Sequence, residues 1–402
     1  MQKNFLIWLL VSLFYAYQYI LRVIPNIIGS ELIDRFQIDT SGIGQFSGLY
    51  YVGYTLAHIP VGILLDRFSP KFVLSVCVIL TFLGTTPLLF ESWAYCNFGR
   101  IIVGIGSSAS AIGLFKVISM YYSQEKFAKM VSFSIIIGLL GATYGGLPLH
   151  LLLNKLGWDY VFITFIALGC FLACAMLFLI PKSNVITSNN EQTNVGFREI
   201  KNLICNKYIL LVSFFGGLMV GPLEGFADGW ATTFFIKVYN ISADLASFLP
   251  SLIFIGMCFG LSLLAYILEK KPTKHYEIVI SCAVLMTVSF MLLLSGHCNI
   301  YVIGILLLLI GGASAYQVVA TCKAISYASN SMVAIATAIS NMIVMFFGYF
   351  FHTLMSEIIG FYSNGSESVA LIKSISIIPI GLIIAVIGFL WLRYKEKNSI
   401  SS

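Results

Sequence analysis

The stretch Gly62-Ile-Leu-Leu-Asp-Arg-Phe-Ser-Pro-Lys71 stands between two apolar runs, residues 42–65 and 71–90. Each run is about long enough to cross the hydrocarbon core of a bilayer, which takes roughly 20 helical residues. The acid and the bases between the runs predict a short loop at one membrane surface. We therefore interpret the rest of the chain outward from two membrane helices and the loop that joins them.

The composition of the whole chain also indicates that lipid surrounds the protein. Charged residues make up 10% of the 402 positions and hydrophobic residues 59%, which leaves too few polar side chains to cover a water-soluble globule. The apolar runs predict an all-α membrane protein with twelve transmembrane helices. These helices are expected near 5–29, 42–65, 71–90, 93–120, 130–153, 159–181, 207–236, 245–268, 276–296, 300–327, 332–356 and 368–393.

Basic residues collect on one set of the predicted loops and at both ends of the chain. Because cytoplasmic loops carry the excess of Lys and Arg, this bias predicts that both termini are cytoplasmic. It also explains the net charge of +6 without a nucleic-acid partner. The nine cysteines have no metal-ligand spacing and are interpreted as packing thiols, so no metal and no cofactor is expected.

A polar stretch divides the chain into an N-terminal bundle (1–181), a cytoplasmic linker (182–206) and a C-terminal bundle (207–402). The two bundles are related by weak internal repeats. An offset of 203 residues aligns Gly53 with Gly256, and an offset of 207 aligns Gly104 with Gly311. Two pseudo-symmetric six-helix bundles are therefore predicted, an arrangement in which a substrate site lies between the halves near the bilayer midplane.

Ionisable residues inside the predicted helices carry the functional argument. Arg22 shares a helix face with Tyr15 and Tyr19, and Glu224 and Asp228 stand one turn apart in helix 7. Buried charges of this kind are expensive in a membrane and mark functional sites. We interpret them as a substrate clamp with a titrating acid, and the alternative is a permanent salt bridge between the halves.

Several other residues are candidates for the same cavity. Lys116 and Lys323 align under the 207-residue offset, and they either attract an anionic solute to the cytoplasmic mouth or are snorkelling lysines. The remaining substrate-binding candidates are Tyr54, Trp230, Tyr316 and Gln317. Tyr50, Tyr51 and His58 could line the cavity as well. Aromatic packing is the alternative for most of these residues.

The loop quoted first resembles the G-x-L-x-D-R-x-G-R-K signature of major facilitator superfamily transporters, from which it departs at Ser69 and Pro70. The resemblance implies the major facilitator fold and transport of a small solute. It also implies a conformational latch in which Asp66 and Arg67 pair with other charges and Gly62 permits close helix approach. The latch residues are Gly62, Asp66, Arg67 and Lys71.

Two further elements are similar to the same superfamily. Arg100 with Gly104 and Gly106 looks like its R-x-x-x-G-x-G element, which implies a place in the coupling network for Arg100; a static interhelical hydrogen-bonding role is the alternative. Helix 5 resembles the glycine-rich element of drug/proton antiporters at Gly138 and Gly141, although the adjacent Gly-Pro pair is missing. We prefer close helix packing as the role of these glycines.

Residues 15–25, with Gly-Phe-Ala-Asp-x-Trp at 225–230, resemble bacterial relatives of the lysosomal dipeptide transporter group. The resemblance implies a zwitterionic solute whose carboxylate meets Arg22 and whose ammonium meets Glu224 or Asp228. Glu224, Asp228 and Arg100 are the candidates for proton coupling. The chain is then a monomer in the bacterial inner membrane, moving its solute either as a symporter with protons or as a facilitator.

Other functions stay open at this stage. A transporter for an organic anion, either a carboxylate or a siderophore-like molecule, is the first alternative, and a drug/proton antiporter or a transporter-like sensor are others. An enzyme is not expected, because the chain has neither a G-x-S-x-G elbow nor an H-E-x-x-H helix.

Overall fold

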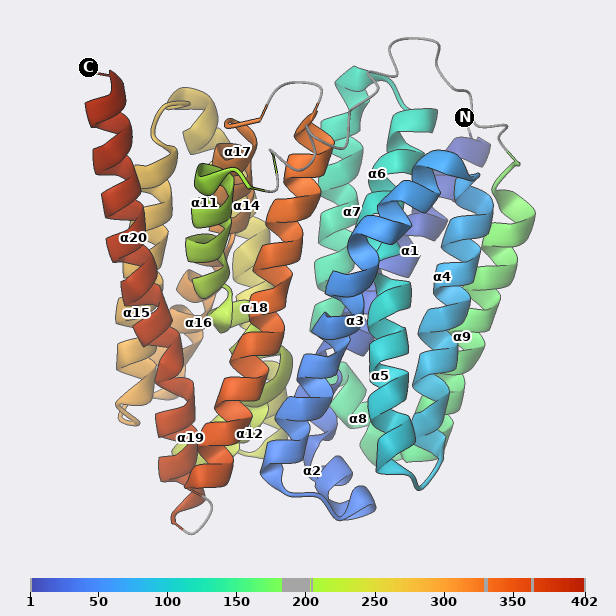
Figure 1. Cartoon of the computed structure of the whole chain (residues 1–402). Coiled ribbons are helices and arrows are strands. Elements are labelled where there is room, and N and C mark those ends of the chain that lie inside the picture. The colour runs from blue at the N-terminus through green and yellow to red at the C-terminus, as the bar shows by residue number, and fades with distance from the viewer. Residues whose placement is uncertain (1, 183–202, 204, 329–331, 363–364, 401–402) are drawn as a thin grey trace. The chain divides into compact units, whose positions relative to one another are not determined.

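The computed structural model describes residues 2–182, 203, 205–328, 332–362 and 365–400 (Figure 1). In this part of the chain, twelve helical segments are long and apolar enough to cross a membrane, and no strand occurs. The predicted all-α, twelve-span fold is therefore confirmed. The chain divides into two compact units, unit 1 (Met1–Ser188) and unit 2 (Asn189–Ser402). Most of the predicted linker, 182–206, lies outside the described residues.

The spans of unit 1 are built from nine α-helices and a short 3₁₀ helix, η1, among the described residues. They are α1 (Gln2–Val23), α2 (Pro25–Phe36), α3 (Thr40–Arg67), α4 (Pro70–Thr85), η1 (Thr86–Leu89), α5 (Trp93–Ser107), α6 (Ala109–Tyr121), α7 (Gln124–Tyr144), α8 (Leu147–Leu156) and α9 (Trp158–Leu179).

Unit 2 contains a ten-residue π-helix, η2 (Gly221–Trp230), in its first span. Its α-helices are α11 (Lys207–Leu218), α12 (Ala231–Tyr239), α13 (Ala243–Phe248), α14 (Ser251–Lys270), α15 (His275–Leu294), α16 (Ile300–Ser314), α17 (Tyr316–Ile325), α18 (Val333–Phe361), α19 (Glu367–Ile375) and α20 (Ile377–Ile400).

The predicted spans near 5–29 and 207–236 are found, and the helix is interrupted within each of them. Proline explains both breaks, since it has no backbone N–H and its ring clashes with the preceding turn. Pro25 ends α1 and begins α2, and Pro222 stands at the start of η2. The helices at 93–120 and 300–327 also divide, at Ser108 and at Ala315.

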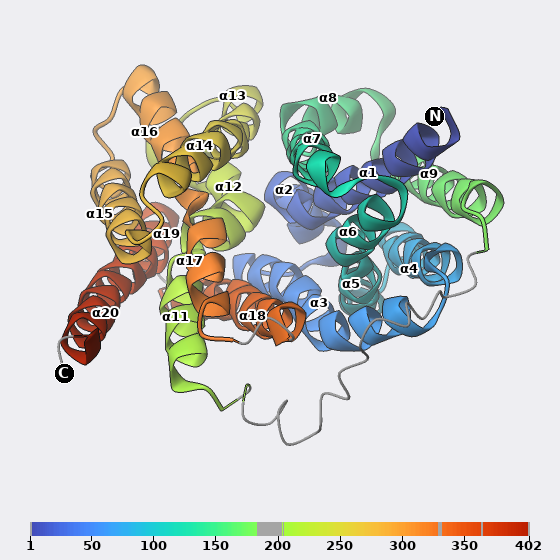
Figure 2. The ribbon, with the colours of Figure 1, turned by 90° about the horizontal axis from the view of Figure 1, so that it is seen from above.

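The two units pair their helices in the same way (Figure 2). In unit 1, α3 packs on α5, α1 on α7, and α4 on α9. In unit 2 the corresponding pairs are α14 with α16, α11 with α18, and α15 with α20. In each unit, the second span pairs with the fourth, the first with the fifth, and the third with the sixth. Each unit therefore repeats one six-span arrangement.

Glycines bring the helices of these pairs into backbone contact. A Cβ built on Gly104 would lie 2.0 Å from the Tyr50 carbonyl oxygen. In unit 2, a Cβ on Gly311 would lie 2.0 Å from the Ile253 carbonyl oxygen. Gly311 and Ile253 are the positions that the offsets of 207 and 203 residues assign to Gly104 and Tyr50. The internal repeat predicted from the sequence is therefore confirmed at its helix contacts.

Candidate substrate-binding site

Arg22 lies in the last turn of α1, directly before the break at Pro25. Its side chain is buried, with 6% of its surface exposed. The guanidinium carbon lies 5.1 Å from the ring centre of Tyr19 and 5.6 Å from that of Tyr51. Aromatic faces attract a cation through the quadrupole of the ring. The last turn of α1 thus carries a buried guanidinium close to two aromatic rings.

Tyr15 and Tyr19 continue this group along α1. Their rings meet edge to face with centres 5.1 Å apart, and their hydroxyls lie 3.5 Å apart. The predicted shared face of Tyr15, Tyr19 and Arg22 is consistent with these contacts. A Cβ on Gly138 of α7 would lie 2.6 Å from the Tyr15 ring, so this glycine provides the space for it. Close packing, the role that we preferred for the helix 5 glycines, is therefore confirmed.

A row of aromatic residues on α3 borders the same region. The rings of Tyr50 and Tyr54 stack with centres 6.0 Å apart, and those of Tyr54 and His58 with centres 5.3 Å apart. The spacing of four residues places them on one helix face. The Tyr50 hydroxyl donates a hydrogen bond of 2.8 Å to the side-chain oxygen of Gln18. Sequence reasoning missed Gln18, although an amide in an apolar helix one turn before Arg22 is a usable signal.

Arg100 on α5 binds the end of α1. Its Nη1 donates to the Leu21 carbonyl at 2.5 Å and its Nη2 to the Arg22 carbonyl at 2.7 Å. The guanidinium also lies about 5 Å from the ring centres of Phe46 and Tyr50. These contacts are static interhelical hydrogen bonds, which was one of the two roles predicted for Arg100.

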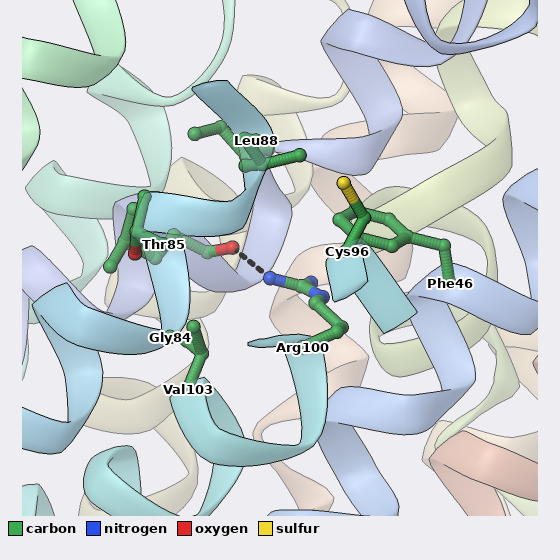
Figure 3. A pocket seen from close by; sticks show the side chains of 9 residues that line it. Phe46, Gly84, Thr85, Leu88, Cys96, Arg100 and Val103 are labelled. Atoms are coloured by element: carbon green, nitrogen blue, oxygen red, sulfur yellow. Dashed lines mark hydrogen bonds between the residues drawn. The ribbon is translucent and has the colours of Figure 1, made fainter. Parts of the chain in front are cut away.

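A cavity of about 10 Å³ borders Arg100 (Figure 3). A dashed line in Figure 3 marks a hydrogen bond donated by Arg100, and Arg100 donates to the Leu21 carbonyl at the edge of this cavity. The residues that line the cavity are Leu21, Ile24, Phe46, Gly84, Thr85, Leu88, Cys96, Arg100 and Val103. A space of this size is enough for about one water molecule. The cavity is therefore too small to be the site of a transported solute.

In unit 2, the π-helix η2 carries Glu224, Asp228 and Trp230, and all three are buried. A π-helix forms i→i+5 bonds, is rare, and is frequently found at functional sites. The amide of Ala231 donates to the Phe226 carbonyl, which is such a bond. Among the described residues, the indole N–H of Trp230 has no hydrogen-bond partner. Since a buried donor without a partner is rare, this N–H is a candidate contact for a solute or a water.

Tyr316 and Gln317 begin α17, and their polar atoms differ. The Tyr316 hydroxyl donates to the Gly216 carbonyl of α11 at 2.6 Å, so it is already used in a structural contact. The side-chain nitrogen of Gln317 is buried and has no partner in the described part of the chain. Of this predicted pair, the geometry favours Gln317 as a solute contact.

Lys323, one of the aligned lysines, lies beside an acid and two aromatic rings. Lys323 forms an ion pair with Glu396 of α20, and its ammonium lies 4.9 Å and 4.8 Å from the ring centres of Tyr276 and Tyr327. The carboxylate neutralises the charge that was predicted to attract an anionic solute. Lys116 occupies the equivalent place on α6 and is half-buried.

The predicted latch spans the end of α3 and the start of α4. A Cβ on Gly62 would meet nothing within 4 Å, so the close helix approach expected at Gly62 is not found among the described residues. It occurs at Gly53 and Gly104 instead. Arg67 is exposed and Lys71 is half-buried, whereas the Asp66 side chain lies outside the described part. Ser69 and Pro70, where the chain departs from the signature, begin α4.

The fold and these residues define a helical membrane protein that carries ionisable side chains inside its spans. The chain belongs to the Major Facilitator Superfamily, whose family model matches residues 7–353. The family resemblance found in the sequence is therefore confirmed.

Relatives and solved structures agree with this family. An uncharacterized transporter of Rickettsia bellii is 24% identical over 62% of each chain. The probable galactarate/D-glucarate transporter GudP of Escherichia coli is 22% identical over 61% of each chain. A bacterial homolog of the human lysosomal transporter Spinster, inward-facing and unoccupied, has the same fold, with a TM-score of 0.74, 17% identity and 96% of each chain covered. The chain spans less than two thirds of the length of the curated relatives it matches. These relatives bear the names of transporters and not of enzymes, as the sequence predicted.

Proposed function

We propose that the chain is a transporter that moves a small, carboxylate-bearing solute across the membrane by alternating access. The observation that carries this proposal is the buried guanidinium of Arg22, close to the rings of Tyr19 and Tyr51 where α1 ends. A guanidinium binds a carboxylate through two parallel hydrogen bonds. Family membership supports the transport activity, and the chemistry of Arg22 supports the class of solute.

The solute that we favour is zwitterionic, such as a dipeptide or an amino acid. Two buried carboxyl groups, Glu224 and Asp228, support this choice because either could pair with an ammonium group. In this arrangement Tyr15, Tyr54, Trp230 and Gln317 contribute contacts to the remainder of the solute. Lys116 contributes attraction for an anionic group.

A dianionic sugar acid is the second candidate. It is favoured by the similarity to a relative named as a probable galactarate/D-glucarate transporter. A thermal-shift panel of the purified protein separates the two candidates, because a ligand stabilises the state that binds it. Dipeptides and amino acids should raise the unfolding midpoint if the first candidate is right. Sugar dicarboxylates should do so if the second is right, and neutral monosaccharides serve as the control.

The direct test is uptake of the best ligand into liposomes. Arg22→Gln should abolish binding, because the amide cannot replace a bidentate cation. The matched control is Arg35→Gln, which removes an arginine that is partly exposed on α2 and pairs with Asp159 at 3.5 Å. Arg35→Gln should transport as the wild type does. Normal binding by the Arg22→Gln protein contradicts the proposal.

Proton coupling through Glu224 and Asp228 is part of the proposal. A carboxylate bound at Arg22 would favour proton uptake by these acids, and its release would favour proton loss. Glu224→Gln or Asp228→Asn, whichever removes the titrating acid, should keep substrate binding and remove the dependence of uptake on a pH gradient, because the other acid still pairs with the ammonium group. If the wild type ignores the gradient, the protein is a facilitator and the acids serve only in binding.

We further propose a monomer in a bacterial inner membrane, with both termini in the cytoplasm. The test uses the native Cys205, which is exposed beside α11 on the predicted cytoplasmic side. A membrane-impermeant maleimide should label Cys205 after permeabilisation of cells and leave it unlabelled in intact cells. Labelling in intact cells would reverse the orientation.

A further inference from the structure

Pro25 creates a specific hydrogen-bonding deficit in the first span. The carbonyl of residue i in an α-helix accepts from the amide of residue i+4, and Pro25 has no N–H to give to Leu21. The carbonyl of Arg22 belongs to the same last turn, where carbonyls are commonly satisfied by groups outside the helix. Inside a membrane, bulk water is not available to replace the missing donors, and the cavity beside Leu21 has room for only about one water molecule. The end of α1 therefore needs donors from another helix.

Arg100 supplies these donors from α5. One guanidinium nitrogen donates to Leu21 at 2.5 Å and the other to Arg22 at 2.7 Å, so the planar fork spans two consecutive carbonyls. Phe46 and Tyr50 of α3 lie against the guanidinium. The side chain is 4% exposed. Its orientation is thus fixed by contacts from two helices, α1 and α3.

We infer that Arg100 is a positioning residue for Arg22. By binding the backbone carbonyl of Arg22 itself, Arg100 sets the residue at which α1 ends and the direction in which the Arg22 side chain leaves the helix. Arg100 acts on the solute through Arg22, and in this role it does not transfer a proton. The inference about solute affinity rests on the proposed function, whereas the inference about the end of α1 does not.

Unit 2 has no arginine at the equivalent place. The 207-residue offset assigns Leu307 to the place of Arg100, and Leu307 is buried among apolar residues. The offset of 203 assigns Asp228 to the place of Pro25. Unit 2 therefore has no arginine at the place of Arg100, and the proline in its first span, Pro222, stands earlier in the span than Pro25 does.

Hydrogen–deuterium exchange of peptides covering residues 18–30 tests the inference without any solute. Arg100→Gln should accelerate exchange there about tenfold or more, because a charged donor to two carbonyls is lost. Arg100→Lys can donate to one carbonyl in this geometry, so it should give a smaller acceleration of exchange. This second variant keeps the test decisive if the Arg100→Gln protein fails to fold. Pro25→Ala in the Arg100→Gln protein restores an N–H for Leu21 and should slow the exchange again. Arg35→Gln and peptides of α14 serve as controls.

Solute binding and transport complete the test. Arg100→Gln should weaken solute affinity about tenfold or more and keep whatever dependence on a pH gradient the wild type has. Wild-type exchange at residues 18–30, or unchanged affinity together with loss of pH dependence, would overturn the inference. If Arg22→Gln binds the solute normally, the proposed function fails, and the exchange data still decide whether Arg100 holds the end of α1.

Discussion

Unit 1 and unit 2 pack their helices alike and differ in the middle of their first span. The Gly104 contact of α3 with α5 recurs as the Gly311 contact of α14 with α16. In unit 1, however, the first span ends an α-helix at Pro25 and carries a base, Arg22. In unit 2 it forms the π-helix η2 and carries acids. One scaffold thus presents opposite charges at related places, and the packing contacts are separable from the residues proposed to bind the solute.

The largest expected effect tests the shared scaffold. Gly104→Ala and Gly311→Ala each place a methyl group 2.0 Å from a backbone oxygen, and overpacking of this kind destabilises by about 1–3 kcal/mol, sometimes more. The two variants should lower the unfolding midpoint by similar amounts. A thiol-reactive dye measures the midpoint as the additional reaction of the buried Cys77, Cys96 and Cys282 on unfolding, above the constant reaction of the exposed cysteines.

The control for these variants is Gly62→Ala, where the new methyl group meets nothing within 4 Å. Alanine is the better helix former, so this variant should be neutral or stabilised by up to about 1 kcal/mol. A lower unfolding midpoint for Gly104→Ala, with no change for Gly311→Ala, would show that the two helix contacts are not equivalent.

The sequence predicted the spans and the repeat because both depend on local or periodic signals. Apolar runs of about 20 residues define membrane helices. The offset of 207 residues correctly relates Gly104 to Gly311, and the offset of 203 residues relates Tyr50 to Ile253, where the two helix contacts recur. The π-helix was not predicted, since i→i+5 bonding has no recognisable local pattern. Gly225 and Gly229 only weaken the competing α-helix.

The candidate site was predictable where its contacts lie along one helix. The spacing of Tyr15, Tyr19 and Arg22 places them together on α1. Contacts between helices were not predictable in the same way. Tyr51 approaches Arg22 from α3, and Glu396 reaches Lys323 from 73 residues along the chain. Such partners depend on tertiary packing, on which a single sequence gives no direct information.

The second prediction sharpens the comparison at the aligned lysines. Because Glu396 neutralises Lys323, Lys323→Gln should leave the half-saturation concentration unchanged at every ionic strength. It should instead destabilise unit 2 by about 1–2 kcal/mol, since a charged hydrogen bond is lost. Lys116→Gln should raise the half-saturation concentration about twofold to fivefold at low salt and less at high salt. The readout is initial uptake at two salt concentrations.

A double variant checks the ion pair itself. Lys323→Gln combined with Glu396→Gln should destabilise less than the sum of the two single changes, as expected for interacting residues. A salt-dependent rise in half-saturation for Lys323→Gln, as large as that for Lys116→Gln, would show that both lysines act on the solute and that the units do not differ here.

The smallest expected effect concerns a serine contact that both units use between their first and fifth spans. In unit 1 the hydroxyls of Ser12 and Ser134 lie 3.0 Å apart, and the indole N–H of Trp8 donates to Ser134 at 2.8 Å. In unit 2, Ser213 donates to Ser340 at 2.9 Å. A hydrogen bond between membrane helices stabilises by only about 0.6 kcal/mol on average, with a maximum near 1.7.

Ser340→Ala should therefore reduce stability by about 0.6 kcal/mol, whereas Ser134→Ala should approach the upper value because it also leaves the buried Trp8 donor without its acceptor. Trp8→Phe removes that donor, so adding Ser134→Ala to Trp8→Phe should cause a loss close to that of Ser340→Ala. The measurement is the unfolding midpoint in the same detergent for all variants. Equal losses for Ser134→Ala and Ser340→Ala would mean that the Trp8 bond adds nothing, and that the two serine contacts are equivalent in energy as well as in position.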